Sequence, residues 1–186
     1  MKLIFALGNP GKEYEQTRHN VGFAAIDSLA HENSASWQEK SKFKALVAEV
    51  SVAGEKIILA KPTTFYNQVG ESYRALVDFY KLESEDILIV HDELALPIGT
   101  VRLREGGSDA GNNGVKSVLR HGGGHEARVR IGISNEQREV IDDANFVLGR
   151  FTKEESEKLA NILKTVRTTC EQFARGEFEL TSIKHD

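Results

Sequence analysis

Apolar and polar residues alternate along several short segments of this chain, and the pattern predicts a series of strands. The first is an apolar, β-prone segment that stops at Gly8-Asn9-Pro10-Gly11, a sequence typical of a turn. Residues 87–90 are apolar without interruption, which is typical of a central strand covered on both faces. A hairpin turn is expected at Ala53-Gly54-Glu55. The predicted strands span residues 2–7, 43–50, 56–60, 87–90, 100–104 and 127–133.

Between these strands, apolar residues recur at helical spacing. The clearest helix is the last one, where Thr152 and Glu155 form a capping box and Gly176 is a natural stop. Its apolar stripe includes Cys170, which we therefore expect in the core. Asn113 or a neighbour is expected to cap a short helix that follows a Gly- and Asn-rich loop. The other predicted helices span residues 20–31, 68–81 and 115–121.

Because strands and helices interleave, the pattern predicts an α/β fold, a twisted mixed β-sheet with helices on both faces. A chain of 186 residues fits a single domain, residues 1–186. In such sheets, ligands bind near the carboxyl ends of the strands. The ends of the strands at residues 2–7 and 87–90 are therefore the first places to look for chemistry.

Composition excludes several classes of protein. The longest apolar run, residues 21–26, is far shorter than the about 20 residues of a transmembrane helix. The first apolar segment is too short for a signal peptide, so we expect a cytoplasmic protein. Cys170 is the one cysteine, which excludes an internal disulfide and a cysteine-based zinc site. The scattered histidines show no metal-binding spacing, so we expect no metal.

Charge is unevenly distributed along the chain. The formal net charge is −4, which gives no hint of nucleic-acid binding. Between residues 100 and 135, however, lysines and arginines outnumber acidic residues, and the region predicts a local basic face. Chance clustering on a solvated surface explains the same charges equally well. The basic residues of this region are Arg102, Arg104, Lys116, Arg120, Arg128 and Arg130.

A nucleotide-binding loop does not fit the glycines near the N-terminus. Gly8 and Gly11 do not have the spacing of a dinucleotide-binding motif, and Gly11-Lys12 is followed by Glu13 rather than Ser or Thr. The serines lack a nucleophile-elbow motif, and Cys170 lies on an apolar helix stripe. The chain therefore lacks a recognisable covalent nucleophile, and we expect no cofactor.

His19 and Asp92 together suggest a catalytic dyad. His19 lies at the start of the first helix, and Asp92 is expected to mark the end of the buried strand at residues 87–90, where such sheets place their ligands. A carboxylate that accepts from one imidazole nitrogen leaves the other nitrogen free to deprotonate water. Taken singly, a local hydrogen bond for His19 and a turn role for Asp92 are the simpler interpretations.

Three asparagines, Asn9, Asn67 and Asn113, follow predicted elements in loops. A neutral amide can donate and accept without repelling a polyanion, so these residues could orient a water and a peptide-like ligand. Ordinary turn chemistry also accounts for each of them.

Over its whole length the chain resembles the bacterial peptidyl-tRNA hydrolase family. The matching segments are LGNPGKEYEQTRHNVGF, KPTTFYNQVG, ILIVHDELALPIG, GGSDAGNNGVKS, RVRIGIS and FVLGRF, in that order. The resemblance implies a monomeric, metal-free enzyme that cleaves the ester between an N-blocked peptide and the terminal ribose of tRNA. Its role is to recycle tRNA from prematurely released peptidyl-tRNA.

The resemblance also implies roles for individual residues. His19 matches the catalytic base, Asp92 the acid that stabilises its basic form, and Asn9 the residue that tells blocked from free amino groups. The expected partner is peptidyl-tRNA, bound at its acceptor stem and CCA end, without a membrane. Substrate contacts match Tyr14, Phe65, Asn67 and Asn113, and phosphate contacts match Arg102, Arg104 and Arg130.

Three positions depart from the family pattern. Tyr66 stands where most members have Met, Asn112 where His is usual, and Ser134-Asn135 replaces a common Gly-His-Pro loop. We expect these changes to reshape the cleft without removing the dyad. Tyr66 is expected to lie at the cleft wall and pack against the catalytic region, with a hydroxyl that needs a partner but takes no part in the chemistry.

Two other functions stay open at this point. A non-catalytic RNA-binding protein could share the fold, but it would not need the pair His19 and Asp92. A small-molecule esterase would not need Arg102, Arg104 and Arg130 on one surface. Salt dependence separates tRNA from a small ester, because phosphate contacts weaken as the salt concentration rises.

Overall fold

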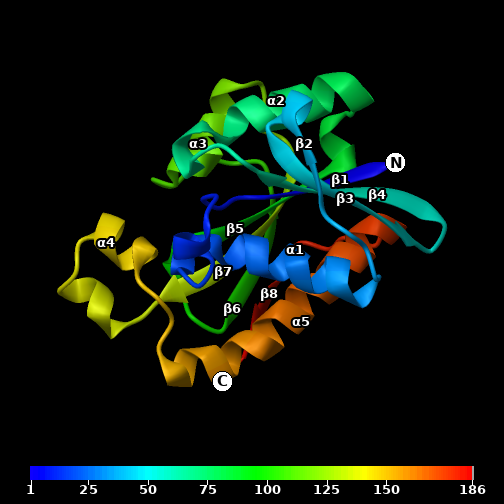
Figure 1. The fold of residues 1–186 in the computed structure, drawn as a ribbon. Helices are drawn as coiled ribbons and strands as arrows, with labels where there is room; N and C mark the ends of the chain where they lie inside the picture. Colours follow the sequence, from blue (N-terminus) through cyan, green and yellow to red (C-terminus); the bar gives the residue numbers. More distant parts are fainter. Residues whose placement is uncertain (186) are drawn as a thin grey trace.

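The fold is built around one mixed sheet. A computed structural model describes residues 1–185, within which eight strands pair in the order β2-β3-β4-β1-β5-β7-β6-β8 (Figure 1). At its centre, β4, β1, β5 and β7 run parallel, and the other strands join antiparallel on either side. The strands are β1 (Lys2–Ala6), β2 (Gln38–Lys40), β3 (Ala45–Val52), β4 (Glu55–Pro62), β5 (Ile87–Pro97), β6 (Thr100–Glu105), β7 (Ala127–Ser134) and β8 (Ser182–Lys184).

Helices cover both faces of this sheet, which confirms the predicted fold class (Figure 1). One face packs against α1 and α5, and the other against α2 and α3. The long helix α5 begins with the predicted capping box of Thr152 and Glu155 and ends at Gly176, whose φ is 78°. The helices are α1 (Val21–Glu32), α2 (Val69–Tyr80), α3 (Asn113–Arg120), α4 (Asp143–Leu148) and α5 (Lys153–Arg175).

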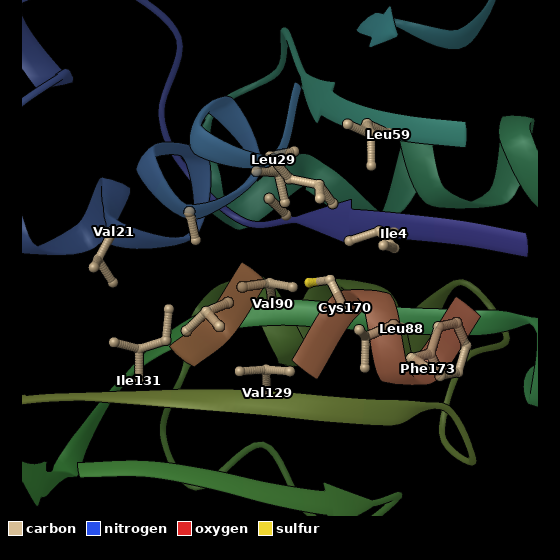
Figure 2. Close-up of a cluster of buried hydrophobic side chains, with 14 of the residues drawn as sticks. Ile4, Val21, Leu29, Leu59, Leu88, Val90, Val129, Ile131, Cys170 and Phe173 are labelled. Carbon is tan, nitrogen blue, oxygen red and sulfur yellow. The ribbon is translucent and has the colours of Figure 1, made fainter. Parts of the chain in front are cut away.

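Alternation along the strands divides the core into two clusters. Leu88 and Val90 of β5 pack toward α1 and α5, whereas Ile87 and Ile89 pack toward α2 and α3. Figure 2 shows the first cluster, with Cys170 of α5 among the buried side chains, as its place on the apolar stripe predicts. Both faces of β5 are therefore buried, as a continuous apolar strand requires.

The prediction that β5 ends before Asp92 is wrong. Its pairing with β1 stops at Val90, opposite Ala6, but its pairing with β7 continues through Asp92 and Glu93. β5 therefore extends beyond the end of β1, and Asp92 lies within a strand rather than in a turn. The segments that carry His19 and Tyr66 come together, and the two rings stack on each other.

Short elements escaped the sequence analysis. They are β2, β8, α4 and several single turns of 3-10 helix, of which η2 (Arg18–Asn20), η4 (Tyr66–Gln68) and η6 (Glu136–Glu139) bear on the site. Three to six residues are too few to show a hydrophobic period. The cap of α3 is Asn112, whose side chain accepts the Val115 N–H. Within the described residues, no helix is long and apolar enough to cross a membrane.

Candidate active site

His19 and Asp92 meet, although 72 residues separate them in the chain. His19 Nδ1 lies 2.9 Å from Asp92 Oδ2, and Asp92 is only 1% exposed whereas the His19 side chain is 14% exposed. An ionised carboxylate can only accept, so Nδ1 carries the proton and Nε2 is left with a free lone pair. The geometry thus provides a base that can accept a proton from a water molecule.

The turn that carries His19 is fixed by its neighbour Arg18. The Arg18 N–H donates to the Gly149 carbonyl at 2.9 Å, and its guanidinium pairs with Glu155 at 2.8 Å. The guanidinium also packs over the Phe146 and Phe151 rings, at 4.6 and 5.1 Å from their centroids. Because Arg18 is buried and held on several sides, η2 presents His19 in one position.

Asn9 is held in one orientation by two other residues. Its backbone N–H donates to Asn20 Oδ1 and its carbonyl accepts from Asn20 Nδ2, both at 2.9 Å. Its side-chain Oδ1 accepts the Tyr66 N–H at 2.8 Å. Since the amide oxygen is committed, the Asn9 NH₂ group is the part available as a donor. Asn9 itself lines a second cavity, of about 270 Å³, next to Asn20 and Phe23.

The dyad opens onto a cavity of about 310 Å³. Of the predicted site residues, His19, Asp92 and Asn113 line this cavity directly. Tyr14 is half-buried in the first loop, and Phe65 and Asn67 are exposed on either side of Tyr66. The cavity is lined by His19, Asp92, Glu93, Leu94, Ala95, Ala110, Gly111, Asn112, Asn113, Arg138, Asp143, Ala144 and Val147.

Sequence analysis missed three charged residues of this cavity: Glu93, Arg138 and Asp143. The Arg138 guanidinium donates to the Leu94 carbonyl at 2.8 Å and pairs with Asp143 at 3.1 Å. Arg138 and Asp143 lie in or near short elements without a periodic pattern, so the sequence carries no signal for them.

Tyr66 is not where we expected it. It is 4% exposed and lies beneath His19 rather than at the cavity wall; the two rings stack with centroids 3.5 Å apart at 14°. Its hydroxyl donates to Asp92 Oδ1 at 2.5 Å, so the expected hydroxyl partner is the carboxylate that also contacts His19. Asn112 Nδ2 in turn donates to the Tyr66 hydroxyl at 2.9 Å. Two of the three departures from the family pattern therefore touch each other behind the dyad.

Four arginines share one face of β6 and β7. Arg102 lies opposite Arg130 and Arg104 opposite Arg128 in the antiparallel register, so all four side chains leave the sheet on the same side. The intervening residues, Val101, Leu103, Val129 and Ile131, point to the core beneath α1 and α5. We call Arg102, Arg104, Arg128 and Arg130 the arginine face.

The four residues of the arginine face differ in their burial and in the groups that they contact. Arg128 is buried and donates to the carbonyls of Gly107 and Ser108 at 3.1 and 3.0 Å, so it braces the loop before α3. Arg130, with 23% of its side chain exposed, pairs with Glu93 at 2.7 Å. Arg102 donates to Ser182 Oγ at 3.0 Å and Arg104 to the Leu103 carbonyl at 2.7 Å. Neither of these two partners is anionic, so Arg102 and Arg104 keep their full charge.

Comparison with known proteins decides the family. A family model described as Peptidyl-tRNA hydrolase matches residues 3–185. The chain belongs to the peptidyl-tRNA hydrolase family. The peptidyl-tRNA hydrolase of Listeria welshimeri is 47% identical over 180 residues, which cover 96% of each chain. That of Gloeobacter violaceus is 48% identical over 164 residues, which cover 88% of this chain and 82% of the relative.

Solved structures of the family share the fold. The crystal structure of peptidyl-tRNA hydrolase from Acinetobacter baumannii is 32% identical, has a TM-score of 0.88, and covers 95% of this chain and 90% of that one. The family predicted from the sequence motifs is confirmed, and with it the enzyme class.

Proposed function

We propose that this member of the peptidyl-tRNA hydrolase family hydrolyses the ester between an N-blocked peptide and the terminal ribose of tRNA, with His19 as the general base. The observation that carries the proposal is the contact of His19 Nδ1 with Asp92, which leaves Nε2 free beside the cavity. We further propose that the enzyme is a monomer, as the resemblance implies, and that it is a single domain that works in the cytoplasm, as its length and composition lead us to expect.

The reaction needs a base, a water and donors for an oxyanion. Neutral His19 takes a proton from water through Nε2, and the resulting hydroxide adds to the ester carbonyl. The tetrahedral intermediate then expels the ribose oxygen, which receives the proton from His19. Asp92 stabilises the imidazolium between these two steps. General-base assistance of this kind contributes about 10²–10⁴ in rate.

Side-chain amides are the proposed donors at the reacting carbonyl. The NH₂ group of Asn9 is available because its oxygen is already bound to Tyr66, and Asn113 lines the cavity beside His19. Preorganised donors stabilise the developing negative charge without reorganising during the reaction. Tyr14, Phe65 and Asn67 are proposed contacts for the peptide and the CCA end, on their match to the family positions.

Arg102, Arg104 and Arg130 of the arginine face are the proposed contacts for the acceptor-stem phosphates. The arginine face meets the cavity through Glu93, which lines the cavity and pairs with Arg130. Phosphate contacts fix the position of a nucleic acid without reading its sequence, as an enzyme that accepts many tRNAs requires. The exposed ends of Arg102 and Arg104 are the stronger candidates, because Arg130 already has a carboxylate partner.

A release assay with N-blocked aminoacyl-tRNA and its free-amine form tests the proposal. The protein should release tRNA from the blocked form, and His19→Ala should lower kcat by at least about 100-fold while tRNA binding persists. Asp92→Asn should lower kcat less, by disturbing the tautomer. The control is His31→Ala, which removes an exposed histidine at the end of α1 and should leave kcat unchanged.

Two results would overturn the proposal. Turnover of His19→Ala within tenfold of the parent would remove His19 as the base. Binding of tRNA without hydrolysis of either form by the parent would leave the non-catalytic RNA-binding alternative.

A further inference from the structure

A chain of hydrogen bonds runs from the start of α3 to His19, and its first member is Asn112. The Asn112 side-chain oxygen accepts the Val115 N–H at 3.0 Å and so caps α3. The amide can turn in only one way while it serves as a cap, so its NH₂ group points the other way. That group donates to the Tyr66 hydroxyl at 2.9 Å and to the Asp92 carbonyl at 3.2 Å.

The direction of the Tyr66 hydroxyl follows from that of Asn112. An amide NH₂ can only donate, so the Tyr66 oxygen accepts from it, and the single hydroxyl proton goes to Asp92 Oδ1 at 2.5 Å. Burial, together with the nearby charge of Asp92, holds the pKa of Tyr66 well above its ordinary value. The hydroxyl therefore stays protonated and remains a donor throughout the working pH range.

The Asp92 carboxylate thus has one oxygen for Tyr66 and the other for His19. Oδ1 accepts from Tyr66, and Oδ2 accepts from His19 Nδ1 at 2.9 Å. The Tyr66 ring also lies flat against the His19 ring, 3.5 Å away. One residue therefore fixes both the carboxylate that orients the base and the plane of the base itself.

We infer that Tyr66 is a positioning residue that, with Asn112, lowers the proton affinity of His19 through Asp92. A hydrogen bond to Asp92 Oδ1 spreads the negative charge that would otherwise favour the imidazolium. With Tyr66 in place, more of His19 is in the neutral form that the reaction uses. The inference rests on the proposed function, in which neutral His19 is the base.

Other charged groups near His19 also act on its proton affinity. Glu93, Arg138 and Asp143 line the same cavity, and Arg130 pairs with Glu93 from β7. His91 lies next to Asp92 on β5, and its Nδ1 is 2.7 Å from the Asp92 carbonyl oxygen. None of these contacts is altered by removing one hydroxyl from Tyr66, so a Phe variant isolates the effect of that hydroxyl.

Tyr66→Phe and the matched control Tyr73→Phe test the inference. Tyr73 is also buried, at 3% exposure, and its hydroxyl also donates to a carboxylate, Glu126, at 2.5 Å. We expect Tyr66→Phe to move the acidic limb of the kcat/KM profile to higher pH by about half a unit or more. Tyr73→Phe should leave that limb in place, although both variants lose a buried hydrogen bond.

A second variant tests the link through Asn112. Asn112→Ser keeps a residue that caps helices well but removes the NH₂ donor. It should move the acidic limb in the same direction, by less than Tyr66→Phe does. In the Tyr66→Phe background it should add little further shift, because the proposed effect of Asn112 passes through the Tyr66 hydroxyl. Additive shifts in the double variant, or an unmoved limb in Tyr66→Phe, would overturn the inference.

Titration of the His19 ring by NMR separates this inference from the proposed function, because it needs no hydrolysis. The pKa of His19 should rise in Tyr66→Phe and stay unchanged in Tyr73→Phe, whatever the substrate. If Tyr66→Phe does not fold, Tyr66→Met removes the same hydroxyl and should give the same rise. An unchanged His19 pKa in a folded variant would refute the positioning role even if the parent hydrolyses peptidyl-tRNA.

Discussion

Several residues of this site each make contacts on two sides, and these contacts remove their freedom to turn. Asn112 caps α3 and donates to Tyr66, and Asn9 accepts from Tyr66 while Asn20 holds its backbone. Because these contacts decide the orientation of both amides, the NH₂ groups of Asn9 and Asn112 are already directed before substrate arrives. Preorganisation of this kind is what electrostatic catalysis requires.

Some residues of the site could be predicted from the sequence, and some of their contacts could not. Family motifs were enough to single out His19 and Asp92, and the structure brings the two together. The contact between Tyr66 and Asp92 could not be predicted, because it depends on where two neighbouring strands stop pairing. β1 ends opposite Val90 of β5, and Asp92 lies two residues further along β5. Only the three-dimensional structure shows that Tyr66 lies beneath His19.

Cys170 provides a prediction for a single side chain. Burial raises the pKa of its thiol to about 12, so the thiol stays protonated and unreactive in the folded protein. We expect thiol reagents at pH 8 to leave the folded enzyme unmodified and active. Cys170→Ala should remain active and lose about 1 kcal/mol of unfolding free energy in urea, since it trims the core. Rapid modification without unfolding would contradict this.

At the scale of elements, β5 shows how tertiary partners extend a strand. Its apolar part was predicted from residues 87–90, but His91, Asp92 and Glu93 have the polarity of a turn. They continue the strand because their backbone pairs with β7, and the side chains of Asp92 and Glu93 have partners in His19 and Arg130. These partners lie on other elements or depend on the fold, so local propensity could not reveal them.

The buried pair of Arg18 and Glu155 joins the turn of His19 to the first turn of α5. Burial by itself raises the pKa of Glu155, but hydrogen bonds from Arg18, the Thr152 N–H and Asn135 outweigh it, and the pKa lies below its ordinary value. The resulting stability is present above the unfolded-state pKa, about 4.3, and is lost as pH falls through the lower folded-state pKa.

We therefore expect Glu155→Gln to reduce the free energy of unfolding at pH 7 by on the order of 3 kcal/mol, because it leaves Arg18 buried without its anion. The difference from the parent should shrink as pH falls below about 4. Urea unfolding at both pH values measures this. Glu154→Gln, one residue earlier and exposed, is the control and should change little. An equal loss in both variants would point to the loss of a negative charge in the first turn of α5 rather than to the buried pair.

At the scale of the whole molecule, positive charge is concentrated on one part of a protein whose net charge is negative. The net charge is −4, yet β6 and β7 place four arginines on one side of the sheet. Sequence analysis could detect a basic region but not its geometry, because the cross-strand register decides which side chains share a face. The register also places Val129 and Ile131 on the opposite side, in the core.

Salt dependence tests this face. Arg104→Ala should raise KM for peptidyl-tRNA with little change in kcat, and should reduce the slope of log KM against log salt by about one. Arg102→Ala should act in the same way, and Arg130→Ala should act more weakly because Glu93 already neutralises it. Arg175→Ala, at the end of α5, is the control. Equal KM values at low and high salt would refute phosphate binding here.

The same arrangement has a consequence for the enzyme between turnovers. Across β6 and β7, Arg102 lies opposite Arg130 and Arg104 lies opposite Arg128. Glu93 offsets the charge of Arg130, and Glu126 and Asp109 favour the charge of Arg128. Like charges directly opposite each other destabilise a sheet. Repulsion between these arginines therefore lowers the stability of β6 and β7 when no polyanion is bound. Any polyanion that settles there should raise the melting temperature, and tRNA without a peptide should do so as well. Bound tRNA would then stabilise the folded protein. The protein without bound tRNA would be more easily unfolded by heat and more easily cleaved by proteases.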